Sequence, residues 1–173
     1  NTLNPTMNIW NGLRYKVYFD WNRQANKVQT TDGPATYNAG FDARYYYPIF
    51  QNFIWAGRAS GDFSFGNQKL VYYLGGVDGW LMFGPNQKPG SSRDRYFNTN
   101  NQPAADQTYA FESLAVNMRG FLQNSANGNN AFVINSELRL PVFSTLFNRP
   151  INNAFLRNFQ VIQFVDLGTA WNG

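Results

Sequence analysis

Few side chains in this sequence could perform chemistry. The carboxylates Asp42, Asp62 and Glu137 could be read as a glycosidase acid pair, but they alternate with arginines along strand-like segments. Carboxylates in that setting more often form ion networks. The sequence has no cysteine and no histidine, which excludes thiolate nucleophiles, Ser–His–Asp relays and His or Cys zinc sites. We therefore expect no enzymatic activity, no cofactor and no metal site.

The composition favours an all-β fold. The sequence contains Phe 16, Tyr 10 and Trp 5 but only 14% charged residues, and aromatic residues prefer strands. No apolar run approaches the roughly 18 residues expected of a membrane helix. The basic residues are dispersed and form no patch of the kind that binds nucleic acid. The remaining classes are a soluble β-sandwich and a membrane β-barrel.

Five segments alternate apolar and polar residues with period two, which predicts strands. They span approximately 12–22, 36–48, 53–65, 131–141 and 157–168. The connection 66–130 is rich in Gly, Asn, Pro and Ser, and it is only briefly strand-like, at 70–74. A connection of that length is usually functional or disordered. Alternating short and long connections are typical of outer-membrane barrels.

The distribution of charged and aromatic residues favours a barrel over a sandwich. The charged residues of the five segments fall on one face, which a barrel would turn towards its watery lumen. Aromatic residues gather near strand ends, as in interfacial belts: Trp10, Trp21, Tyr45, Tyr47, Trp55 and Trp171. Five strands are too few to close such a barrel. Residues 1–173 are therefore expected to be a fragment of one outer-membrane barrel domain.

Three motifs follow one another in the second half of the chain. They are Met118-Arg119-Gly120-Phe121, the segment Asn135-Ser136-Glu137-Leu138-Arg139-Leu140-Pro141, and Phe164-Val165-Asp166-Leu167-Gly168 with Trp171 after it. In this order they resemble the C-terminal barrel of the bacterial surface antigen superfamily. That superfamily includes the barrel-assembly insertase, the translocation-and-assembly module and two-partner secretion pores. The resemblance covers roughly residues 57–173.

The resemblance implies an antiparallel transmembrane barrel of about sixteen strands. The five segments would be its ninth to thirteenth strands, and residues 66–130 would be the sixth extracellular loop, folded into the lumen. The tip of that loop would dock on the thirteenth strand. The tip would be Arg119, Gly120 and Phe121, and the docking motif Phe164, Asp166 and Gly168, with Glu137 as a possible second partner for the arginine.

The chemistry of the tip agrees with this implication. An arginine in a confined lumen needs a carboxylate, and the guanidinium fork suits one, so we expect Arg119 to pair with Asp166. The missing side chain of Gly120 would let Phe164 approach its backbone. One departure stands out: relatives place a Gly-Gly pair a few residues before the tip, whereas Gly75-Gly76 is separated from it by residues 77–117.

The implied function is the insertion of outer-membrane proteins, or the translocation of polypeptides, by an integral protein of the bacterial outer membrane. The implied partners are unfolded outer-membrane protein clients, membrane lipid or lipopolysaccharide, and accessory assembly subunits. Two alternatives stay open. A passive pore or receptor barrel for solutes would need no brace between Arg119 and Asp166. A soluble carbohydrate-binding β-sandwich would use its aromatic residues for recognition.

Overall fold

The computed structural model describes residues 9, 11–23, 35–50, 52–76, 97–98, 100–147 and 151–173. The expected all-β class is confirmed, because strands dominate these residues. The elements in chain order are β1 (Gly12–Arg23), β2 (Ala35–Phe50), β3 (Phe53–Gly66), β4 (Lys69–Gly75), β5 (Tyr109–Asn117), β6 (Ala126–Gly128), β7 (Asn130–Pro141), α1 (Val142–Leu146), α2 (Ala154–Asn158) and β8 (Gln160–Trp171).

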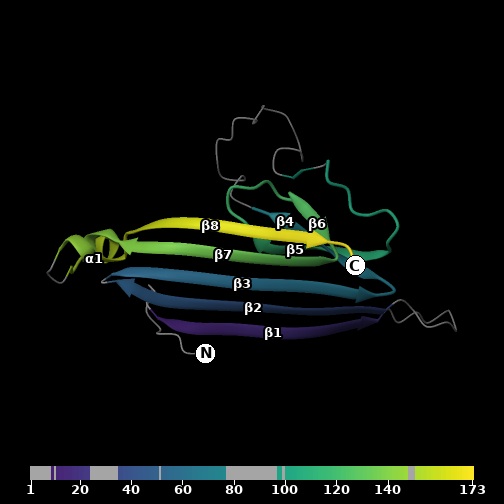
Figure 1. The fold of residues 1–173 in the computed structure, drawn as a ribbon, viewed down its shortest axis with the longest axis horizontal. Helices are drawn as coiled ribbons and strands as arrows, with labels where there is room; N and C mark the ends of the chain where they lie inside the picture. Colours follow the sequence, from purple (N-terminus) through teal and green to yellow (C-terminus); the bar gives the residue numbers. More distant parts are fainter. Residues whose placement is uncertain are drawn as a thin grey trace. The chain divides into compact units, whose positions relative to one another are not determined.

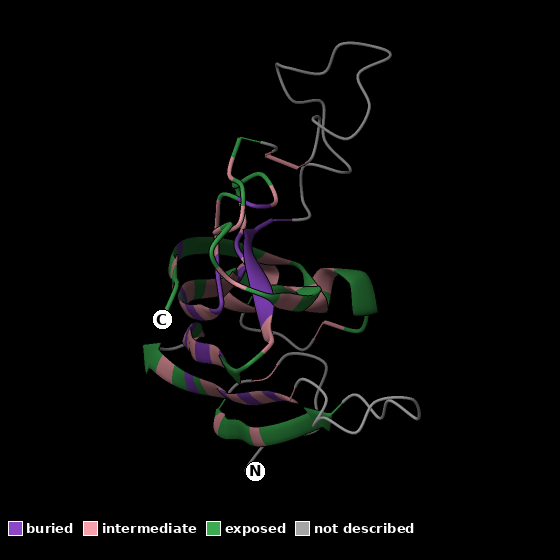
Figure 2. Ribbon diagram, turned by 90° about the vertical axis from the view of Figure 1, so that its right-hand side faces the viewer, coloured by how far each residue is buried: buried purple, intermediate pink, exposed green. Residues whose placement is uncertain are grey.

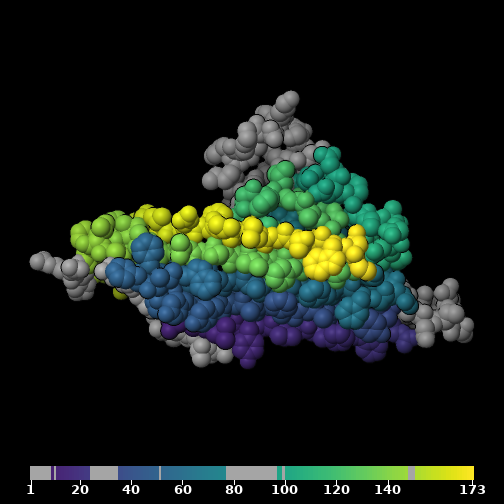
Figure 3. Space-filling model, viewed as in Figure 1, coloured from purple at the N-terminus to yellow at the C-terminus, as the bar shows by residue number. Residues whose placement is uncertain are grey.

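The larger sheet is a meander with one interruption. Its strand order is β1-β2-β3-β7-β8, and successive strands run in opposite directions (Figure 1). The space-filling view shows the strands in the same succession of colours (Figure 3). Among the described residues the sheet is open, with β1 and β8 at its edges. Everything between β3 and β7 is inserted between two neighbouring strands.

The burial of polar and apolar side chains in these strands is the reverse of that in a soluble sheet. In β2 the buried residues are Thr36, Asn38, Gly40 and Tyr46, whereas Tyr45 and Tyr47 are exposed. In β7 Asn135 is buried and Ile134 and Leu138 are exposed. Buried and exposed residues alternate along these strands in Figure 2. The polar faces are therefore covered, and the apolar faces are open.

A second sheet replaces part of the expected loop 66–130. Its strand order is β5-β4-β6. The strands β4 and β5 are parallel, with Lys69 opposite Tyr109 and Gly75 opposite Asn117, while β6 is antiparallel to β4. Parallel neighbours require a crossover connection, which accounts for much of the length of the insertion. The strand-like stretch predicted at 70–74 corresponds to β4, whereas β5 and β6 form where the sequence predicted only loop.

The end of the chain also differs from the predicted strand 157–168. Residues Ala154–Asn158 form α2, whose first turn is capped by the Asn153 side chain accepting from the backbone N–H groups of Phe155 and Leu156. Asparagine is a preferred N-cap because its side-chain oxygen satisfies otherwise unpaired N–H groups. The strand β8 consequently begins at Gln160 and continues to Trp171.

The described chain divides into two compact units. The first contains Asp42–Ala59 and Ile134–Asp166 with the N-terminal stretch to Lys16, and so holds both helices. The second contains Val17–Phe41, Ser60–Val133 and Leu167–Gly173, and so holds β4, β5 and β6. The apolar core of the second unit consists of Leu70, Tyr72, Leu74, Val116, Met118, Ala131 and Val133.

Candidate functional site

The turn that carries the predicted tip is joined to the end of β4. The backbone N–H of Met118 donates to the carbonyl oxygen of Gly75 over 2.9 Å, and the N–H of Gly76 donates to the carbonyl oxygen of Phe121 over 3.1 Å. These two bonds bracket residues 118–121. The Gly-Gly pair that is distant from the tip in sequence is thus adjacent to it in space.

No larger residue could replace this glycine pair without displacing the turn. A Cβ atom placed on Gly76 would lie 2.8 Å from the carbonyl oxygen of Phe121 and closer still to that of Met118. A Cβ atom on Gly75 would overlap the carbonyl oxygen of Leu122. Because the obstructing atoms belong to the backbone, they cannot move aside as a flexible side chain could. The pair therefore fixes the position of the tip turn relative to β4.

Met118, directly before the tip, connects the insertion to β8. Its side chain is only 5% exposed and lies in the core of the second unit. A Cβ atom placed on Gly168 would lie 2.5 Å from Met118 Sδ and 3.1 Å from Met118 Cε. Gly168 is one of the three residues predicted to receive the loop. Sequence reasoning quoted Met118 within the motif but gave it no role.

Asparagine side chains hold the return from the tip to β6. Asn124 is fully buried and has a φ of 61°, a left-handed conformation that asparagine tolerates better than most residues. Its amide donates to the carbonyl oxygens of Asn98 and Asn101, each over 2.8 Å, and its Oδ1 accepts from Asn127 over 2.8 Å. The asparagine content that suggested an irregular loop instead provides ordered side-chain hydrogen bonds.

The tip residues themselves lie in the turn after β5. Gly120 has a φ of 81°, and nothing lies within 4 Å of a Cβ placed on it. This left-handed backbone conformation favours glycine at the position. Phe121 is 46% exposed. Whether Phe164 packs near Gly120 stays a prediction.

The predicted docking motif lies on β8. Asp166 is buried, and Phe164 is partly exposed. Both belong to the first unit, whereas Arg119 belongs to the second. A buried carboxylate requires a compensating partner, so the burial of Asp166 is compatible with the predicted pairing. The contact between Arg119 and Asp166 stays a prediction.

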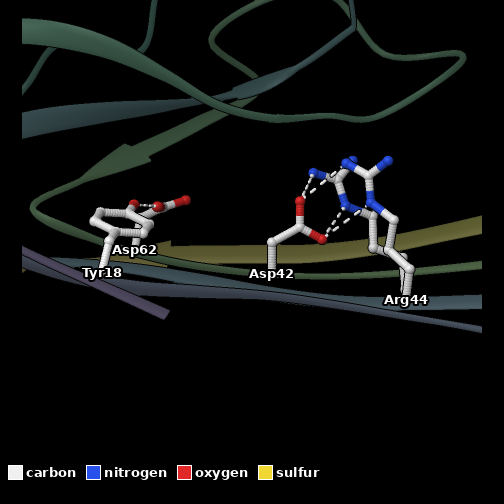
Figure 4. Close-up of polar contacts among 5 residues, drawn as sticks. Tyr18, Asp42, Arg44 and Asp62 are labelled. Atoms are coloured by element: carbon white, nitrogen blue, oxygen red, sulfur yellow. Dashed lines mark hydrogen bonds and ion pairs between the residues drawn. The ribbon is translucent and has the colours of Figure 1, made fainter. Parts of the chain in front are cut away.

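Asp42 lies at the centre of an ion cluster in the first unit. Arg44 donates to both carboxylate oxygens of Asp42, over 3.1 and 2.9 Å, and Arg58 does the same over 3.1 and 2.7 Å. Figure 4 shows the two guanidinium groups against the one carboxylate. Bidentate pairs of this type are strong and orientation-specific. The expected ion network between neighbouring strands is therefore present at Asp42.

Glu137 has a partner in its own strand. Arg139 donates to Glu137 Oε2 from Nε over 2.8 Å and from a terminal nitrogen over 2.5 Å. The guanidinium of Arg139 also lies 5.5 Å from the ring centre of Tyr46, within cation–π range. The family resemblance implied Glu137 as a possible second partner for Arg119. That role stays a prediction.

The second unit contains a further polar contact, in which the hydroxyl of Tyr18 donates to Asp62 (Figure 4). Strand β4 of the same unit carries Tyr72, which is 4% exposed. Burial raises the pKa of Tyr72 to about 12, and the carboxylates Asp62 and Asp20 contribute to the increase. Tyr72 is consequently neutral at physiological pH, as a core residue should be.

The described residues contain no group of three or more His, Cys, Asp or Glu side chains that could hold a metal ion. Within the same part of the chain, neither helix has the length and hydropathy needed to cross a membrane.

No family model, no curated protein and no solved structure matches this chain.

Proposed function

We propose that this chain is part of an outer-membrane β-barrel that inserts membrane proteins or translocates polypeptides. The observation that carries the proposal is the inverted exposure of the strands. Val17 is 77% exposed and Leu167 62% exposed, whereas Asn38 and Ser60 are 4% and 2% exposed. Barrel strands in lipid face outward with their apolar side chains. A soluble sandwich would bury those faces instead.

Anchoring of the insertion favours the assembly or translocation function over a passive pore. Ala131 and Val133 lie on the polar side of β7, yet each is only 1% exposed and packs with the core formed by β4 and β5. In an open, porin-like pore that side would line a water-filled channel. The contact of Met118 with Gly168 adds a second attachment. Both observations support a loop held inside the barrel wall.

The mechanism we propose is mechanical and involves no covalent step. A weak seam between the first and last strands of the complete barrel would offer its strand edges to an unfolded client, because unpaired strand edges template the pairing of another chain. The inserted sheet and tip would meanwhile brace the opposite part of the wall. The role of the seam rests on the family resemblance. The bracing role is inferred from the contacts of Gly75, Gly76, Met118 and Gly168.

Reconstitution of the full-length protein into lipid vesicles tests the function. The measured quantity is the rate at which an unfolded outer-membrane barrel client acquires resistance to denaturation by detergent at room temperature. We expect the protein to accelerate client folding, and Arg119→Ala to remove most of that acceleration. A protein that releases an enclosed small dye but leaves client folding unchanged would be a passive pore, contrary to the proposal.

A further inference from the structure

The connection between β7 and β8 carries a largely exposed apolar patch. The patch consists of Phe143, Leu146, Phe147, Phe155 and Phe159. Leu146 and Phe155 are each 71% exposed, and Phe147 is 56% exposed. Ring centres lie 6.3 Å apart for Phe143 and Phe147, 5.5 Å for Phe143 and Phe159, and 6.1 Å for Phe155 and Phe159. Contiguous exposed apolar groups usually mark a binding surface.

Hydrogen bonds hold the patch in its exposed position. Thr145 Oγ1 donates to the carbonyl oxygen of Pro141 over 2.8 Å, and the Asn52 amide donates to the carbonyl oxygen of Ser144 over 3.0 Å. The latter bond ties α1 to the turn between β2 and β3. The Asn153 cap fixes the start of α2. The described aromatic residues of the connection therefore lie on or beside two short helices that these hydrogen bonds hold.

Charge and continuity indicate what covers the patch. The sequence 141–159 contains Arg149 and Arg157 and no acidic residue. Cationic and aromatic residues together are typical of segments that lie in the interface of anionic lipids. Phe159 also continues the exposed apolar series of β8, where Val161 and Val165 are 54% and 56% exposed. One surface thus runs from the outward face of the strand onto the helical connection.

We propose that the patch is immersed in the phospholipid head-group region of the leaflet next to this end of the barrel, with Phe155 and Leu146 reaching the acyl boundary. The inference rests on the proposed barrel function. It adds that the β7–β8 connection is a membrane-interface anchor and is not a free turn in the aqueous compartment. The partner is an anionic phospholipid surface.

Site-specific fluorescence tests the proposal. Residues 1–173 contain no cysteine, and any cysteine elsewhere in the full-length protein is first replaced by serine. Full-length protein with Phe155→Cys or Leu146→Cys is labelled with an environment-sensitive fluorophore and reconstituted into vesicles containing phosphatidylglycerol. Asn152→Cys, an exposed polar position in the same connection, is the matched control. Val165→Cys, on the exposed apolar face of β8, reports membrane insertion of the strands.

We expect nitroxide-labelled lipids to quench the labels at positions 155 and 146 several-fold more strongly than the label at position 152. Quenching at position 165 without quenching at 155 or 146 would overturn the anchor and leave the proposed barrel intact, and it would point to a protein partner for the patch. Absence of quenching at position 165 as well would overturn the proposed barrel itself.

Discussion

The sulfur atom of Met118 packs against the backbone of Gly168. Arg119 follows the first of these residues directly, and Asp166 precedes the second by two positions. The two residues of this contact are thus neighbours in sequence of Arg119 and Asp166, the predicted ion pair. A side chain at Gly168 would remove this attachment, because the space it needs is already occupied.

Gly168→Val should destabilise the protein by about 1–3 kcal/mol through overpacking. The adjacent Thr169→Val, at an exposed position, is the control and should change the free energy of unfolding by less than about 0.5 kcal/mol. Urea titration of the full-length protein measures both. Adding Met118→Ala should recover part of the loss in Gly168→Val. Equal stability of the two valine variants would mean that the close approach is unimportant.

Arg119→Ala and Asp166→Ala should each cost about 3–5 kcal/mol, as expected when one partner of a buried ion pair is removed. The double variant should cost less than the sum of the two, because both substitutions remove one interaction. The free energy of unfolding and the client-folding rate are both suitable measurements. Strict additivity would identify Arg119 and Asp166 as unrelated residues.

Val17→Arg should destabilise the folded protein in lipid by about 2–4 kcal/mol, because it places a charge on the outward face at mid-membrane. Lys16→Gln, one residue away on the opposite face, should have little effect. The fraction refolded in vesicles, measured against urea concentration, gives both values. If the two variants refold equally well, Val17 does not face lipid.

Asp42→Asn should cost about 1–3 kcal/mol, because it weakens charge-assisted hydrogen bonds and leaves two guanidinium groups near each other. Arg44→Gln should cost less, since Asp42 retains its bidentate contact with Arg58. The side chains of Asp42, Arg44 and Arg58 are partly exposed. Solvent screening therefore lowers the expected loss of stability in both variants. A larger loss for Arg44→Gln than for Asp42→Asn would show that Arg58 alone does not hold the carboxylate.

Alkaline stability should depend on Tyr72. Its pKa is raised to about 12 in the folded state, whereas an unfolded chain releases this proton near about pH 10. The contribution of Tyr72 to the free energy of unfolding is therefore complete below about pH 10, and it is lost as the pH rises through about 12. Tyr72→Phe should flatten the decline in unfolding free energy over this range, whereas Tyr15→Phe, at an exposed position, should not. Parallel pH profiles for wild type and Tyr72→Phe would contradict the assignment.

The strands of the larger sheet could be predicted because period-two alternation is a local property of the sequence. It located β1, β2, β3 and β7 closely, while α2 displaced the start of β8 because a helix of five residues leaves no detectable periodicity. Alternation does not reveal which face is buried. The barrel interpretation of the sequence turned the charged face towards a lumen, and the exposure of residues such as Val17 and Leu167 agrees with the open apolar face that it requires.

The second sheet could not be predicted because its main pairing is distant in sequence. Residues Leu70 to Leu74 form an apolar run without alternation, and their partner β5 begins only at Tyr109. No turn signal marks a parallel pairing, in contrast to a hairpin. The association of Gly75 and Gly76 with the tip depends on that pairing. For the same reason, this association could not be predicted from the sequence.

The pairing of β4 with β6 has a consequence for how the larger sheet is held together. The strands β3 and β7 are neighbours, but the whole insertion separates them, and closing so long a connection is entropically unfavourable and slow. The strand β4 begins shortly after β3 ends, and β6 ends directly before β7. Pairing of Tyr72 with Gly128 therefore brings the two distant ends together, after which Asn129 and Ser64 join them. We expect the folded insertion to act as an internal clamp that keeps the end of β3 and the start of β7 side by side.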